Sequence, residues 1–88
     1  MLLYMNSIKW TPKATKQVRK LDKQHAKQVV VAVGELTNMP ACQNVKALTN
    51  HEHQYRLRVG NYRVFFNFDG AVRIVSIEEV KKRDERTY

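Results

Sequence analysis

The spacing of apolar residues changes at Thr11. Before it, the stretch NSIKW alternates apolar and polar positions, which predicts a short strand with Ile8 and Trp10 on one face. Thr11 followed by Pro12 is typical of a helix start, because threonine caps free backbone N–H groups and proline fits the first helical position. Apolar residues then recur at helical spacing: Ala14, Val18 and Leu21. This stripe predicts an amphipathic helix.

A second helical pattern runs over about residues 23–37. Its apolar residues keep the same spacing: Ala26, Val29, Val30, Val33 and Leu36. The letters NMP at 38–40 end the pattern, and a break near Asp22 would fold the two helices into a hairpin. Residues 40–53 show no sustained period, so we interpret them as a connection.

From Gln54 the period changes to two, which predicts strands. The expected strands and the two-residue turns between them are 54–59, Gly60-Asn61, 62–68, Asp69-Gly70 and 71–77. The remaining letters, EEVKKRDERTY, form a polar tail. The order strand, two helices, three strands predicts one α+β domain over residues 1–88, in which a helical hairpin packs on one face of a mainly antiparallel sheet.

A two-residue turn at Gly60-Asn61 fixes which residues lie opposite each other. It places Arg58 opposite Arg63 and Arg56 opposite Phe65, and directly opposite residues share a face of the sheet. The face expected to receive the helices is apolar: Tyr55, Leu57, Val59, Tyr62, Val64, Phe66, Phe68, Val75 and Ile77. The other face carries Gln54, Arg56, Arg58, Arg63, Asn67 and Ser76, with Glu78 near one end.

A two-residue turn at Asp69-Gly70 would set the register of the last strand in the same way. It places Arg63 opposite Ser76 and Phe65 opposite Ile74. Arg73 would then fall on the apolar face, so we expect it at the sheet margin, or else a bulge that shifts this register.

The three arginines on the polar face allow two interpretations. Like charges directly opposite each other are destabilising, so the side chains can separate into solvent and meet Glu78 or water. Alternatively they form an anion site, because guanidinium groups fit phosphate oxygens.

Charge favours a polyanionic partner. Sixteen lysines and arginines stand against eight acidic residues, a net charge of +8. Nucleic acid is the first candidate, an anionic membrane surface the second and an acidic protein the third. A continuous helix would also place five lysines in one stripe, either as a solvated face or as a contact to nucleic-acid backbone: Lys13, Lys16, Lys20, Lys23 and Lys27.

Other chemistry is sparse. Cys42 is the only cysteine, which excludes a disulfide framework and fits a reducing cytoplasm. The apolar start MLLYMNS is too short for a signal peptide or a membrane span, so we expect an intracellular, soluble protein. His51 and His53 lack further ligands nearby in sequence, so we expect an exposed loop with no metal, although either histidine is a candidate proton donor.

The stretch YRLRVGNYRVFFNFDGAVRIVSI followed by EEVKKRDERTY resembles the C-terminal half of RelE-type toxins, in the RelE/ParE superfamily of bacterial toxin–antitoxin systems. The preceding strand, helical hairpin and proline-containing loop match the same layout. The resemblance implies a RelE-like fold and a ribosome-dependent endoribonuclease that cuts mRNA in the ribosomal A site. It also implies a cytoplasmic protein without a cofactor or a membrane, whose partners are a cognate antitoxin, the ribosome with its 16S rRNA, and mRNA.

The resemblance further implies roles for individual residues. The catalytic set is Arg56, Arg58, Arg63, Arg83 and Tyr88, with Lys82 as the substitute for Arg83. The RNA- or ribosome-binding set is Lys13, Lys16, Lys20, Lys23, Lys27, Lys81 and Lys82. Because Arg56 and Arg58 stand where this branch often has lysines, and arginine does not lose its proton, they would stabilise charge rather than act as bases. Tyr88 is the candidate base, and Glu78, Glu79 or a histidine are the alternatives.

Two other functions are compatible with the same resemblance. A ParE-like toxin would inhibit DNA gyrase without cutting RNA, and its arginines would be a docking surface. An inactive member would bind its antitoxin and co-repress its operon.

Overall fold

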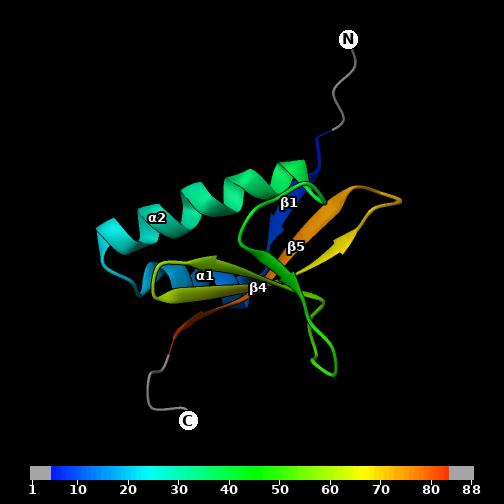
Figure 1. The fold of residues 1–88 in the computed structure, drawn as a ribbon. Helices are drawn as coiled ribbons and strands as arrows, with labels where there is room; N and C mark the ends of the chain where they lie inside the picture. The colour runs from blue at the N-terminus through cyan, green and yellow to red at the C-terminus, as the bar shows by residue number, and fades with distance from the viewer. Residues whose placement is uncertain (1–4, 84–88) are drawn as a thin grey trace.

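The computed structural model describes residues 5–83 (Figure 1). Its elements are β1 (Ser7–Trp10), α1 (Pro12–Arg19), α2 (Lys23–Gly34), the short 3-10 helix η1 (Glu35–Asn38), β2 (Val45–Ala47), β3 (Tyr55–Val59), β4 (Tyr62–Asp69) and β5 (Ile74–Lys82). The five strands form one sheet in the order β1-β5-β4-β3-β2. β1 is parallel to β5, and the other pairs are antiparallel. The predicted α+β class is confirmed.

The two helices begin where the sequence predicts. Thr11 Oγ1 accepts a hydrogen bond from the Ala14 backbone N–H (3.1 Å), and Asp22 Oδ1 accepts one from that of His25 (2.9 Å). Each cap satisfies a backbone donor that the first helical turn leaves free. The break at Asp22 therefore produces the expected hairpin.

The predicted apolar face is the core. Seven of its nine residues are buried, and Tyr55 and Phe68 pack against them while partly exposed. The helices contribute Ala14, Val29, Val33 and Leu36 to the same cluster, and Ile8 and Trp10 pack at its edge. Within residues 5–83 no helix packs on the opposite face of the sheet, and we call it the outer face.

The register of β5 differs from the prediction. The turn after β4 spans residues 70–73, with Asp69 paired to Ile74, and the Asp69 Oδ1 accepts a hydrogen bond from the Ala71 N–H (2.9 Å). Arg73 lies in this turn with φ 58°, at the margin of the sheet, so it is not on the apolar face. The side chain of Asp69 stabilises a longer turn than the Asp-Gly pair suggests.

A bulge shifts the pairing further. Phe66 pairs with Ile77 but Phe65 pairs with Glu79, so Glu78 is an extra residue on β5. The bulge returns Val80 to the core, where it is buried. The predicted pairs of Arg63 with Ser76 and of Phe65 with Ile74 were therefore wrong, and Arg63 lies opposite Lys81.

Two segments taken as irregular are strands. β2 lies within the expected connection and pairs with β3, but three residues are too few to show alternation. Residues 78–82, interpreted as a polar tail, continue β5 beyond the end of β1. There α1 covers the strand edge, and the Val80 N–H donates to Gln17 Oε1 (2.6 Å).

Candidate functional site

The tight turn between β3 and β4 brings the predicted arginines together. Arg58 lies opposite Arg63, as expected, and the backbone N–H of Arg83 donates to the carbonyl of Asn61 in the turn (2.6 Å). Gly60 adopts φ 55°, which glycine reaches without the cost that a Cβ brings. A small hollow of about 60 Å³ is lined by Arg56, Arg58, Gly60, Tyr62, Arg63 and Arg83. We call these four arginines the arginine cluster.

The arginine cluster is short of negative charge. Within residues 5–83 no carboxylate forms an ion pair with any of its guanidinium groups. Glu78, the expected partner, instead accepts a hydrogen bond from the Ser76 hydroxyl at 2.6 Å. Burial lowers the pKa of Arg56, and the charges of the other three arginines lower it further. Its Nε atom is buried without a hydrogen-bond partner among the described residues. A bound anion would relieve the repulsion among these charges.

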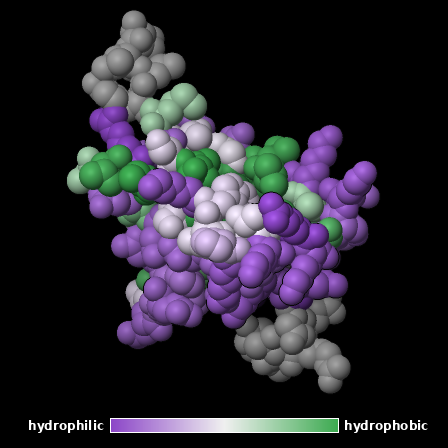
Figure 2. Space-filling model, turned by 180° about the vertical axis from the view of Figure 1, so that it is seen from behind, coloured by the Kyte–Doolittle hydropathy of each residue, from purple (hydrophilic) through white to green (hydrophobic). Residues whose placement is uncertain are grey.

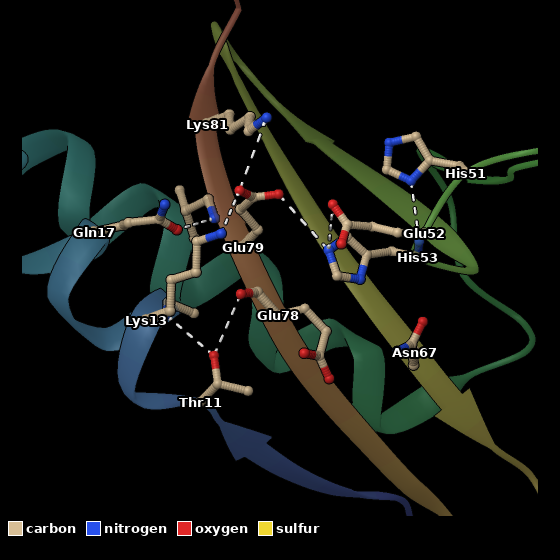
Figure 3. A network of polar contacts seen from close by, with 12 residues as sticks. Thr11, Lys13, Gln17, His51, Glu52, His53, Asn67, Glu78, Glu79 and Lys81 are labelled. Atoms are coloured by element: carbon tan, nitrogen blue, oxygen red, sulfur yellow. Dashed lines mark hydrogen bonds and ion pairs between the residues drawn. The ribbon is translucent and has the colours of Figure 1, made fainter.

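Sequence reasoning missed a second cluster, built around the buried carboxylate of Glu79. This carboxylate contacts Lys13 Nζ (2.8 Å), His53 Nε2 (3.7 Å) and Lys81 Nζ (3.8 Å), which come from α1, the loop before β3, and β5 (Figure 3). The hydrogen bond from Lys13 lowers the pKa of Glu79, and the nearby positive charges act in the same direction, while burial opposes them. Glu79 is therefore a structural anion and a poor candidate for a general base.

The histidine loop is not simply exposed. The side chain of His53 is only 12% exposed and lies between Glu79 and Glu52, whose Oε1 is 4.0 Å from His53 Nε2. His51 is exposed at the surface, but its ring stacks on Phe65 with centroids 4.9 Å apart. Among residues 5–83, Glu52, His53 and Glu79 are a set that could hold a metal ion, with ligand atoms within 4.8 Å of one another. They fit a metal ion poorly, because the ammonium groups of Lys13 and Lys81 already neutralise Glu79.

The lysines do not form the single stripe that a continuous helix would give, because the chain turns at Asp22. Lys13 and Lys16 lie on α1, Lys20 is its C-cap, and Lys23 and Lys27 lie on α2. The hydrogen bond to Glu79 raises the pKa of Lys13, so this lysine serves an internal contact. Lys81 lies opposite Arg63 beside the arginine cluster, and Lys82 lies opposite Tyr62 with its side chain exposed. Hydrophilic residues cover much of the face shown in Figure 2, interrupted by smaller hydrophobic areas.

Comparison with known proteins shows the family of this chain. The family model that describes the ParE toxin of the type II toxin–antitoxin system parDE matches residues 8–87. The chain belongs to this toxin family, in the RelE/ParE superfamily. No curated protein matches it by sequence.

Solved structures similar to the toxin are RelE proteins. One is in the RelBE2 toxin–antitoxin complex of Mycobacterium tuberculosis, at 27% identity and TM-score 0.76, covering 90% of this chain and 99% of that one. Another is in the archaeal RelE–RelB complex of Pyrococcus horikoshii OT3, at 22% identity and TM-score 0.78, covering 92% and 98%. The isolated Escherichia coli RelE toxin aligns at 18% identity and TM-score 0.77, covering 93% and 88%. The RelE-like fold expected from the sequence is confirmed.

Two further sequence predictions concern the terminal tyrosine and the membrane. Tyr88, the candidate base, lies outside the described residues. Of the helices within residues 5–83, none is long and apolar enough to span a membrane.

Proposed function

We propose that this toxin is a ribosome-dependent endoribonuclease that cleaves mRNA in the ribosomal A site and thereby inhibits translation. The observation that carries the proposal is the arginine cluster: four guanidinium groups line one hollow, with no carboxylate partner within residues 5–83. A phosphodiester matches this surplus of fixed, planar donors. The similarity to RelE toxins in fold supports the same interpretation.

The proposed reaction is attack of a ribose 2′-OH on its own phosphate. It requires a base for the hydroxyl, cations for the negative charge that develops on the phosphoryl oxygens, and an acid for the departing 5′-oxygen. The arginine cluster supplies the cations, and preorganised charge of this kind commonly gives the largest contribution to catalysis. Arginine keeps its proton, so another group must act as the base. Glu79 is a weak base, because its hydrogen bond to Lys13 and the nearby positive charges lower the pKa of Glu79. Tyr88 therefore remains our candidate for the base.

We also propose that a cognate antitoxin holds the toxin inactive in the cell. Two of the similar solved structures described above are complexes of a RelE toxin with RelB. Co-expression with the neighbouring reading frame of the operon should restore growth, and co-purification should recover both chains. If co-expression of the neighbouring reading frames does not restore growth, this part of the proposal fails.

The ParE family match favours one second candidate, a toxin that inhibits DNA gyrase. The arginine cluster would then contact protein or DNA. Induction of such a toxin would cause DNA damage and relaxed or cleaved plasmid, while reporter mRNA stays intact.

The decisive experiment is primer extension on a reporter mRNA translated in a reconstituted system, with and without ribosomes and toxin. The proposal predicts new 5′ ends inside codons only when ribosomes and toxin are both present. Arg63→Ala should abolish these cuts, and the matched control Arg19→Ala, which removes one exposed arginine of α1, should keep them. Intact mRNA together with inhibited growth would favour a toxin that inhibits DNA gyrase. Normal growth without the antitoxin would indicate an inactive member of the family.

A further inference from the structure

Phe65 is the one aromatic residue that the β4 register places on the outer face, opposite Arg56 on one side and Glu79 on the other. It is nevertheless buried, with 7% of its surface exposed. The loop before β3 covers it: the ring of His51 lies nearly parallel to it, with an angle of 17° between their planes, and His53 packs at a centroid distance of 6.1 Å. The outer face therefore presents an imidazole ring on top of a phenylalanine.

Several contacts hold the ring of His51 in place. Its Nδ1 accepts a hydrogen bond from the backbone N–H of His53 (3.0 Å), which fixes the orientation of the ring. His53 is in turn held against Glu79, and Glu79 is held by Lys13 from α1 (Figure 3). A surface histidine is thus fixed by a chain of contacts that reaches two other elements.

The position of this ring relative to the arginine cluster is set by the sheet. Arg56 pairs directly with Phe65, and the Arg58–Arg63 pair is one row further along, about 7 Å away. On the other side lies the Asn67–Ser76 pair, beside a hollow of about 670 Å³. Residues that line this hollow include Glu52, Gln54, Asn67 and Ser76. The stacked pair therefore lies between a cationic pocket and a roomier one of mixed polar and apolar lining.

The same region holds the two buried side-chain atoms without hydrogen-bond partners among the described residues, Arg56 Nε and His53 Nδ1. Arg56 is paired with Phe65 and His53 is packed on it. Buried polar atoms without partners are uncommon in folded proteins, and a bound water molecule or ion is one explanation for them.

We propose that the outer face binds single-stranded RNA with a phosphate on the arginine cluster and the adjacent nucleobase stacked on the exposed face of His51. The proposal rests on the proposed function for its choice of RNA as the ligand. Aromatic and imidazole rings are common platforms for unpaired bases, and stacking tolerates any base because each has a π-face. The ring of His51 is already supported from below by Phe65, so little order has to be gained on binding.

Direct binding tests this without requiring cleavage. The probes are a fluorescein-labelled 2′-O-methyl hexaribonucleotide, which lacks the attacking hydroxyl, and the same backbone with its bases removed. His51→Ala should weaken binding of the base-bearing probe about tenfold, within the range for loss of one base–aromatic stack, and should leave the abasic probe unchanged. His51→Phe should restore most of the lost affinity, whereas Thr49→Ala, an exposed residue of the same loop, should change neither probe.

Salt dependence separates stacking from charge. Because a stacked base contacts the face of the His51 ring and no phosphate, His51→Ala should leave the slope of log affinity against log salt unchanged, whereas Arg63→Ala should reduce it. Thermal melting establishes that each variant is folded. The inference would be overturned if His51→Ala lost equal affinity for both probes, or lost none for the base-bearing probe. It would also be overturned if the wild type bound the abasic probe as tightly as the base-bearing one.

The two proposals can fail separately. If the wild type shows the His51-dependent preference for bases but leaves translated mRNA intact, the base platform stands and the nuclease assignment falls. If it cleaves mRNA while His51→Ala binds both probes normally, the nuclease stands and the platform falls.

Discussion

Arg58 and Arg63 lie directly opposite each other across the β3–β4 pair, on the outer face of the sheet. Cross-strand neighbours of like charge repel, and within residues 5–83 no carboxylate pairs with either. The fold tolerates this because the core on the opposite face holds the hairpin. A site that binds anions strongly is expected to be destabilised when no anion is bound.

Removing one arginine of the pair should therefore stabilise the protein. We expect Arg58→Thr to raise the free energy of unfolding by about 0.5 kcal/mol, since threonine also suits an exposed strand position. This corresponds to an increase of about 2–4 °C in Tm, measured by circular dichroism at low salt. The gain should shrink at 1 M salt, which screens the repulsion. An unchanged or lower Tm would show that the two side chains separate enough to avoid each other.

A small polyanion should stabilise the wild type through the same cluster. Pyrophosphate at ten times its Kd would add about 1.4 kcal/mol to the free energy of unfolding by mass action. Arg63→Ala should lose most of this gain, and Arg19→Ala on α1 should keep it. Equal shifts in both variants would mean that pyrophosphate acts on the overall charge of +8 rather than on the cluster.

The sequence was sufficient to predict this hairpin because the information is local. A two-residue turn at Gly60-Asn61 and alternation on both sides allow one register in which every apolar residue of the two strands except Phe65 lies on one face. The helix starts at Thr11 and Asp22 were predictable for the same reason, since each cap acts on a backbone N–H three residues away.

The parts that failed depend on distant contacts. The bulge at Glu78 depends on where Val80 packs, and the strand after it is stabilised at its edge by Gln17, which lies 63 residues earlier in the sequence. The Glu79 cluster likewise joins α1, β5 and the loop before β3, so nothing in the letters HEHQ indicated that Phe65 would lie beneath His51.

Loss of the Glu79 carboxylate should destabilise the protein in a pH-dependent way. Its pKa is lowered in the folded state, chiefly by Lys13, so its stabilisation is complete above its ordinary pKa of about 4.5 and is lost as the pH falls through the folded value. Glu79→Gln should cost about 1.5–3 kcal/mol at pH 7, the range for a hydrogen bond to a charged group. In urea titrations, the difference in free energy of unfolding between the wild type and Glu79→Gln should shrink as the pH falls below about 4.5. A difference that stays constant down to pH 3 would show that packing rather than charge causes the loss.

The Gly60 turn offers a test that links backbone conformation to the arginine cluster. Gly60 has φ 55°, and beyond its chain neighbours no atom lies within 4 Å of the position that a Cβ would occupy, so the cost of substitution comes from the backbone. Gly60→Ala should cost about 1 kcal/mol, and Gly60→Asn less, because asparagine adopts the left-handed region more readily. If the turn positions Arg58, Arg63 and Arg83 for phosphate, pyrophosphate affinity should fall more in Gly60→Ala than in Gly60→Asn. The free energy of unfolding and the pyrophosphate affinity should be measured on the same samples. A loss of stability in Gly60→Ala without loss of pyrophosphate affinity would show that the arginines reach the anion through their own flexible side chains.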